Sequence, residues 1–115
     1  MHELSLMENV FNIVLEHGQI VDAKRIIKVN LEVGALSDVI QRWAQLYFDM
    51  ISQDTIADKA KLSFTTIPAI VKCHACGNEY GVDIDKVQYS CPKCESKYIE
   101  LISGREFRIV SIEVE

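Results

Sequence analysis

Hydrophobic residues recur at helical spacing over the first part of the chain. From about Glu3 to His17 they stand three and four positions apart, which predicts an amphipathic helix that begins almost at residue 1. Gly18 follows, and glycine commonly ends a helix in the left-handed conformation. Packing of this helix would hold the amino terminus in place. The apolar stripe comprises Leu4, Met7, Val10, Phe11, Ile13, Val14 and Leu15.

Apolar and polar residues then alternate over 27–33, which predicts a strand with one buried face. That face would be formed by Ile27, Val29, Leu31 and Val33. Gly34-Ala35-Leu36 breaks the alternation, and Ser37 has the character of a helix N-cap, with Asp38 in the first turn. A second helix is predicted from there to about Ser52. Its apolar positions are Val39, Ile40, Trp43, Leu46, Tyr47, Met50 and Ile51, and we interpret Trp43, Tyr47 and Phe48 as packing residues.

Two further strands are predicted on either side of a cysteine-containing region. Residues 61–67 are rich in β-branched and aromatic types and stop near Pro68, and residues 106–115 alternate again. The simplest architecture is an α+β fold: a three-stranded sheet with two helices on one face, plus an inserted zinc-ribbon module. We expect one domain from residues 1–70 and 103–115, and a second from 71–102.

Four cysteines form two C-x-x-C pairs, Cys73 with Cys76 and Cys91 with Cys94, separated by 14 residues. Each pair makes a tight turn that points two thiolates at one ion, and two such turns give tetrahedral S4 coordination, which favours zinc over iron. Such a closed site is structural, because no position stays open for a reacting water. A redox dithiol is less consistent, since neither pair has a strand–helix context. His74 is interpreted as an exposed loop residue, the alternative being a replacement ligand.

Composition narrows the function classes. The 115 residues are 49% hydrophobic and 25% charged, with a net charge of -5, which disfavours a nucleic-acid phosphate backbone as general partner. No apolar run approaches the roughly 18–20 residues that span a bilayer, and no signal peptide is recognised. Paired cysteines in such a chain indicate the reducing cytoplasm and a metal site.

The opening residues Met1-His2-Glu3 offer a second kind of metal chemistry. The terminal amine, the peptide nitrogen of His2 and its imidazole can close fused chelate rings on one ion. The amide or the carboxylate of Glu3 would add a fourth donor. A planar set of nitrogen and oxygen donors suits Ni(II) or Cu(II) better than zinc. The alternative is a frayed terminal histidine.

These features together closely resemble the HypA/HybF family of hydrogenase nickel-insertion accessory proteins. The resemblance rests on Met1-His2-Glu3, on the turn from Val33 to Ser37 and on the two C-x-x-C pairs, and it covers essentially the whole chain. It implies a nickel metallochaperone, not an enzyme, that delivers Ni(II) to [NiFe]-hydrogenase and in some organisms to urease. It also implies that His2, with its own amide and Glu3, binds nickel transiently. Asp38 is carried over only as a nearby carboxylate.

The resemblance further implies structural Zn(II) on the four cysteines. The implied partners are a HypB-type GTPase, the hydrogenase large subunit and urease accessory proteins, with neither nucleic acid nor membrane, in a monomer or weak homodimer. The competing interpretation is a zinc-ribbon module that binds nucleic acid or a transcription component. Lysines in the ribbon alternate with carboxylates and form no positive stripe, which disfavours it. A metalloenzyme is disfavoured because no paired carboxylates surround an open metal position.

Overall fold

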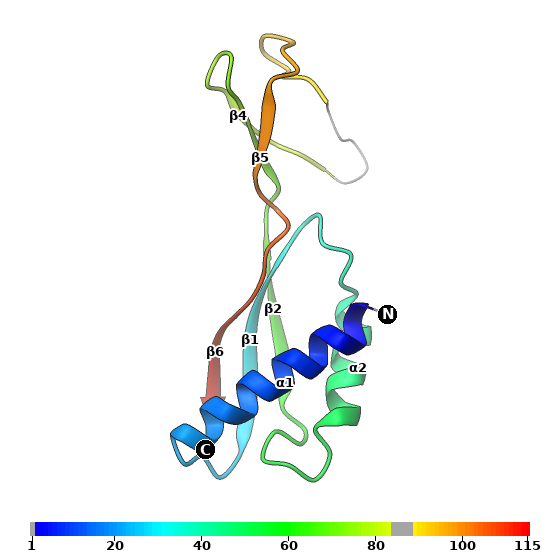
Figure 1. Cartoon of the computed structure of the whole chain (residues 1–115), viewed down its shortest axis with the longest axis vertical. Coiled ribbons are helices and arrows are strands. Elements are labelled where there is room, and N and C mark those ends of the chain that lie inside the picture. Colours follow the sequence, from blue (N-terminus) through cyan, green and yellow to red (C-terminus); the bar gives the residue numbers. More distant parts are fainter. Residues whose placement is uncertain (1, 84–88) are drawn as a thin grey trace. The chain divides into compact units, whose positions relative to one another are not determined.

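The computed structural model describes residues 2–83 and 89–115 of the chain. Its elements, in order, are α1 (His2–Ile20), β1 (Ile26–Gly34), α2 (Gln41–Ile51), β2 (Lys61–Ile67), β3 (Ile70–Cys73), β4 (Glu79–Gly81), β5 (Ile99–Ser103) and β6 (Phe107–Val114) (Figure 1). Two three-stranded sheets form, in the orders β2-β1-β6 and β4-β3-β5. The α+β fold predicted from the sequence is confirmed.

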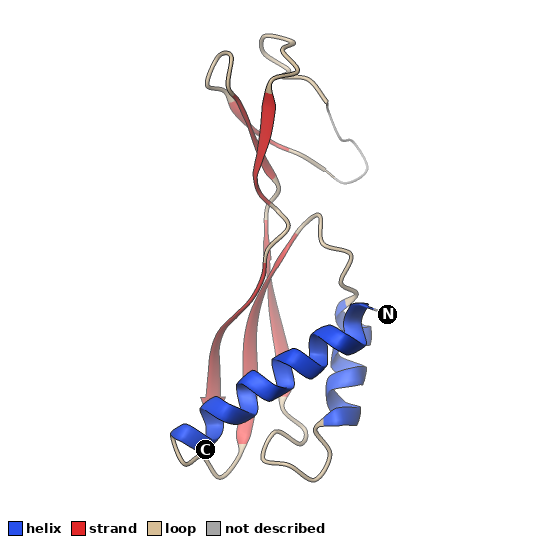
Figure 2. Cartoon of the chain, in the orientation of Figure 1, coloured by secondary structure: helices blue, strands red, loops and turns tan. Residues whose placement is uncertain are grey.

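The chain divides into two compact units. The first, here called the helical unit, comprises Met1–Leu31, Asp38–Thr65 and Arg108–Glu115, and it contains both helices (Figure 2). The second, here called the cysteine unit, comprises Glu32–Ser37 and Thr66–Phe107. The domain boundaries expected from the sequence, 1–70 with 103–115 and 71–102, stay a prediction.

Helix α1 is longer than its sequence pattern predicts. It continues through Gly18 to Ile20, and the residue with a left-handed conformation is Asp22 (φ 56°). Gly18 is buried inside the helix, where an added Cβ would lie 2.9 Å from Cδ1 of Ile26 and 3.0 Å from Cδ1 of Ile56. The prediction that Gly18 ends the helix is therefore wrong. Gly18 lies within the helix, where the lack of a side chain allows close packing against Ile26 and Ile56.

Helix α2 begins later than predicted. The residue before it, Ile40, is extended (φ -94°, ψ 112°), and the N–H of Ser37 donates to the carbonyl of Gly34 at 2.9 Å within a turn. Ser37 is therefore not the N-cap, and Asp38 lies in the exposed connection and not in the first helical turn. Both differences arise because the chain turns directly after strand β1, between Gly34 and Ser37, before α2 begins.

The buried side of α2 also differs from the predicted stripe. Ala44 and Phe48 are fully buried, and the ring of Phe48 meets that of Phe11 edge to face with centroids 6.2 Å apart. Trp43 stacks on Tyr47, with centroids 6.3 Å apart, and remains exposed. Leu46 and Met50 are exposed as well, so the helix keeps an apolar outer face.

Strand β1 supplies much of the core of the helical unit. Val29 and Leu31 are buried as predicted, but Ile26 is buried in place of Ile27, which is 43% exposed. The alternation inferred from the sequence therefore breaks at the start of the strand. The amide of Ile26 donates to the carbonyl of Ile56 at 2.7 Å, which ties this end of the strand to the loop after α2.

In the cysteine unit the backbone makes one very close approach. A Cβ on Gly34 would lie 2.1 Å from the carbonyl carbon and oxygen of Gly104, which itself has φ 124°. Two hydrogen bonds hold the segments together: the N–H of Gly34 donates to the carbonyl of Glu106 at 2.7 Å, and the N–H of Leu36 donates to that of Gly104 at 2.8 Å.

Strand β3 pairs antiparallel with both β4 and β5. Within residues 2–83 and 89–115, neither helix is long and apolar enough to cross a membrane.

Candidate metal centre

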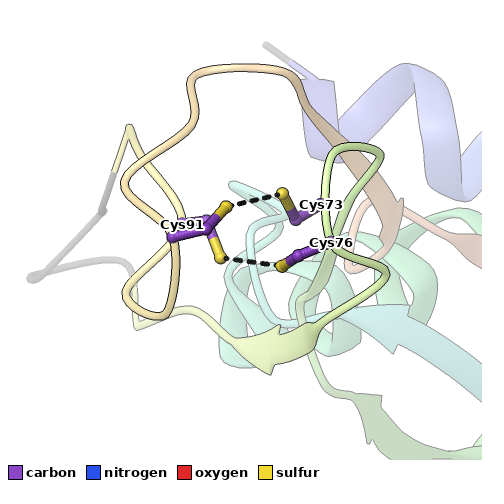
Figure 3. A group of neighbouring side chains, drawn as sticks. Cys73, Cys76 and Cys91 are labelled. Atoms are coloured by element: carbon purple, nitrogen blue, oxygen red, sulfur yellow. Dashed lines mark hydrogen bonds between the residues drawn. The ribbon is translucent and has the colours of Figure 1, made fainter.

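Four sulfur atoms converge in the cysteine unit. Those of Cys73, Cys76, Cys91 and Cys94 all lie within 4.8 Å of one another, and Figure 3 shows the first three pointing toward a common centre. The Cys73–Cys94 and Cys76–Cys91 sulfur distances are 3.5 and 3.7 Å, and all four thiols are free. Four sulfurs around a tetrahedral zinc ion with bonds near 2.3 Å would be about 3.8 Å apart. The donor set therefore has the chemistry and the spacing that zinc requires.

The same backbone turn presents both cysteine pairs. Each turn is closed by a hydrogen bond to the first cysteine's carbonyl, from Gly77 to Cys73 and from Glu95 to Cys91, both at 2.8 Å. In each, the first cysteine's own N–H donates 2.8 Å to the residue five positions on, Asn78 or Ser96. The residue after each second cysteine is left-handed, with φ 79° at Gly77 and 63° at Glu95. Glycine adopts this conformation readily at Gly77, whereas Glu95 is one of few non-glycine residues to adopt it.

Hydrogen bonds to sulfur favour thiolates at two of the four positions. Burial acts to raise the pKa of Cys91, but the backbone N–H groups of Cys94 and Lys93 outweigh it and lower that pKa to about 6. The amide of Asn78 adds an N–H···S contact of 3.8 Å to the same sulfur. The pKa of Cys73 is lowered in the same way, with burial opposed by backbone N–H groups of its own turn.

The remaining pKa shifts come from burial and from the neighbouring cysteine sulfurs. The pKa of Cys94 is raised to about 12: the backbone contact from Ser96 lowers it, but hydrogen bonding with the sulfur of Cys73, burial, and hydrogen bonding with Cys76 and Cys91 together outweigh this. The pKa of the Tyr80 phenol is raised, first by burial and then by the charge of Cys91 and Cys73. A divalent cation would stabilise the thiolates that are brought together here, so the four sulfurs fit the donor set of a metal site.

Two neighbours of the cluster extend the sequence analysis. Asn78 was not singled out as a functional residue, because its contact with Cys91 crosses between the two turns and leaves no sequence signature. His74 was interpreted as an exposed loop residue, and it is exposed. Its Nε2 lies 3.1 Å from Oε1 of Glu100, and its ring packs beside that of Tyr98 with centroids 5.3 Å apart.

The second group of predicted ligands lies at the start of α1. The terminal amine of Met1 and the side chain of His2 lie outside the described part of the structure, whereas the helix itself begins at His2. The carboxylate of Glu3 accepts a hydrogen bond of 3.4 Å from the N–H of Ile40, the residue directly before α2. Asp38 lies two residues earlier in the same connection. No sequence pattern had indicated that Glu3 reaches the start of the second helix.

Comparison with known proteins gives one consistent family. The model of a family described as HypA, a hydrogenase/urease nickel-incorporation metallochaperone, matches residues 1–114. Proteins named hydrogenase maturation factor HypA from Dehalococcoides mccartyi and Acidithiobacillus ferrooxidans are each 36% identical to the chain over 115 residues. These alignments cover all of this chain and 95% and 100% of the two relatives, respectively.

Solved structures support the fold independently. A solution structure of the Ni metallochaperone HypA from Helicobacter pylori superposes with a TM-score of 0.64 at 22% identity, covering 97% of this chain and 96% of that one. A second, a solution structure of HypA protein, gives 0.74 at 23% identity and covers 100% and 97%. At this identity the likeness concerns the arrangement of helices and strands.

Proposed function

Because the chain belongs to the HypA family, and so is a non-catalytic metallochaperone for nickel incorporation into hydrogenase or urease, we propose that its two candidate metal sites have separate tasks. Zn(II) bound by Cys73, Cys76, Cys91 and Cys94 holds the cysteine unit in shape. Ni(II), the cargo, is held transiently at the amino terminus. The convergence of four sulfurs in the cysteine unit is the single observation that supports this division. With the thiolates committed to zinc, the nickel ion meets nitrogen donors first.

The proposed nickel ligands are the amine of Met1, the amide and imidazole of His2, and the amide of Glu3. Helix α1 begins at His2, and the first N–H groups of a helix have no acceptor within it, so deprotonating them breaks no helical hydrogen bond. We favour the amide of Glu3 over its carboxylate, since the carboxylate already accepts from Ile40. Asp38 stays a proposed nearby carboxylate.

The position of this site at the start of a helix favours release of a bound cation. The start of a helix is the positive end of its dipole, which disfavours a cation by a few tenths to about 1 kcal/mol. Two deprotonated amides offset that repulsion only while they stay deprotonated. If these amides regain their protons while an acceptor protein binds the ion, the chelate would therefore loosen one donor at a time. Copper(II) would bind more tightly than nickel, so selectivity depends on metal supply and on docking to partners.

The partners proposed are hydrogenase-related: a HypB-type GTPase, the hydrogenase large subunit as acceptor and urease accessory proteins. The support is that relatives spanning the whole chain are named hydrogenase maturation factors. We also propose that the protein acts in the cytoplasm, since four free thiols suit a reducing compartment. A nucleic-acid role is not proposed. Salt-dependent retention on heparin would instead support nucleic-acid binding.

The test uses tag-free protein loaded with zinc. Calorimetric titration with Ni(II) should give tight binding for the wild type and strong loss for His2→Ala. His17→Ala removes the other histidine of α1 and should bind nickel as the wild type does. Adding a few residues before Met1 should weaken nickel binding without changing zinc content. Wild-type affinity in His2→Ala would refute the amino-terminal site.

A further inference from the structure

Asn78 forms hydrogen bonds with both cysteine turns. Its carbonyl accepts a hydrogen bond of 2.8 Å from the N–H of Cys73, in the first turn. Its side-chain amide donates to the sulfur of Cys91, in the second turn, with Nδ2 and Sγ 3.8 Å apart. Because one contact comes from the main chain and the other from the side chain, Asn78 links the two halves of the four-sulfur cluster.

The equivalent residue of the second turn, Ser96, uses its side chain differently. Its carbonyl accepts a hydrogen bond of 2.8 Å from the N–H of Cys91, as that of Asn78 does from Cys73. Its hydroxyl oxygen, however, accepts a hydrogen bond of 3.1 Å from the N–H of Tyr98, two residues further along the chain. The two turns are therefore alike in their main chains, but they differ in the side chain that follows the second cysteine by two residues.

The sulfur of Cys91 lies where water cannot easily replace a lost protein donor. Cys91 is 1% exposed, whereas Cys76 and Cys94 are exposed. A buried thiolate costs free energy unless N–H groups face it. The N–H of Lys93 lies 3.4 Å from this sulfur, but it belongs to the same turn. The amide of Asn78 is the donor that comes from the other turn, so it fixes the sulfur relative to that turn.

We propose that Asn78 is a positioning residue of the metal centre, which holds the sulfur of Cys91 toward the ion through its side-chain amide. This role rests on the zinc site of the proposed function and extends that site to a residue outside the two C-x-x-C pairs. A hydrogen bond to a metal-bound thiolate draws electron density from the sulfur and fixes the direction in which the sulfur points. Outer partners of this kind typically change metal affinity by about 10–100-fold.

The experiment measures zinc affinity of the full-length protein in reductant, by competition with a chelator. Asn78→Ala removes the N–H donor. Asn78→Asp keeps the size of the side chain but replaces the donor with a carboxylate, which repels the thiolates. We expect the dissociation constant for zinc to rise at least about tenfold in Asn78→Ala, and by at least as much in Asn78→Asp.

Cobalt(II) in place of zinc supplies a readout that a merely structural role would not change. Loss of the hydrogen bond raises the electron density on sulfur, so the sulfur-to-cobalt charge-transfer band should move to longer wavelength in Asn78→Ala.

The matched control is Tyr80→Phe, which deletes a buried hydroxyl near the same sulfurs. The charges of Cys91 and Cys73 contribute to the raised pKa of Tyr80, yet within residues 2–83 and 89–115 its hydroxyl has no hydrogen-bond partner. This variant should therefore keep the wild-type zinc affinity and band position.

The outcomes separate this role from the zinc site itself. Wild-type zinc affinity in Asn78→Ala would overturn the role and leave the zinc site intact. Weaker binding with an unshifted cobalt band would also overturn it, because the side chain would then act on the fold alone. Equal effects in Tyr80→Phe would show that any loss of polarity near the sulfurs suffices, and would refute a specific contact. A wild type that binds neither zinc nor tetrahedral cobalt would overturn both the role and the proposed zinc site.

Discussion

Substituting Gly34 by alanine should strongly destabilise the cysteine unit. The new Cβ would lie 2.1 Å from the carbonyl carbon and oxygen of Gly104 and 2.5 Å from the nitrogen of Arg105. Non-bonded carbon atoms prefer about 3.5–4.0 Å, so the two segments must separate by more than about 1 Å. That movement breaks or stretches the hydrogen bonds from Gly34 to Glu106 and from Leu36 to Gly104.

The magnitude follows from these two bonds. Each backbone hydrogen bond contributes about 0.5–1.5 kcal/mol net, and overpacking costs about 1–3 kcal/mol, so the expected loss in free energy of unfolding is about 2–6 kcal/mol. Urea denaturation of the zinc-loaded protein, followed by circular dichroism, measures it.

The matched control is Gly81→Ala. A Cβ on Gly81 would come no closer than 4.0 Å to the nearest other atom, the carbonyl oxygen of Ala69, and Gly81 lacks a positive φ. That variant should differ from the wild type by less than about 1 kcal/mol. The reasoning fails if Gly34→Ala has the same urea midpoint as the wild type, or if Gly81→Ala loses as much free energy of unfolding as Gly34→Ala.

Three further predictions concern the core, the zinc ligands and Glu3. Ile26→Ala should lower the free energy of unfolding by about 2–5 kcal/mol, whereas Ile27→Ala should cost under about 1 kcal/mol; equal losses in urea denaturation would contradict the observed strand face. Cys91→Ser should weaken zinc binding by more than about 100-fold, beyond the cost of losing an outer-shell partner, as measured by competition with a chelator; unchanged affinity would exclude this ligand. Glu3→Ala should cost about 1 kcal/mol by removing the acceptor for the Ile40 N–H, while Glu3→Gln keeps that acceptor, and both should retain nickel affinity in calorimetry if the donor is the backbone amide. Loss of nickel binding in Glu3→Gln would instead identify the carboxylate as a ligand.

Side-chain periodicity predicted which elements form, and long-range contacts decided where they end. Strand β2 spans the residues expected, because alternation and Pro68 both act within a few positions. The roles predicted for Gly18 and Ser37 were wrong because they depend on contacts with residues distant in the sequence. The role of Gly18 depends on Ile26 in the next strand, and that of Ser37 on a turn whose shape is fixed by the contact of Gly34 with Gly104.

The two candidate metal sites differ in the same way. Two C-x-x-C pairs specify a four-sulfur site almost completely, because each turn is built from adjacent residues. The residues that support the site, such as Asn78, come from outside those pairs and were not predictable. The hydrogen bond between Glu3 and the start of α2 joins residues 37 positions apart, and only the folded chain brings them together.

The two cysteine turns, alike in hydrogen bonding, differ in what they cost to form. Gly77 adopts its left-handed conformation freely, whereas Glu95 in the same position carries a penalty of about 1–2 kcal/mol. Without a bound ion, the turn at Cys73 should therefore form more readily than the turn at Cys91. A metal ion bound by all four cysteines would offset the penalty at Glu95, so the turn at Cys91 would depend more on the ion for its conformation.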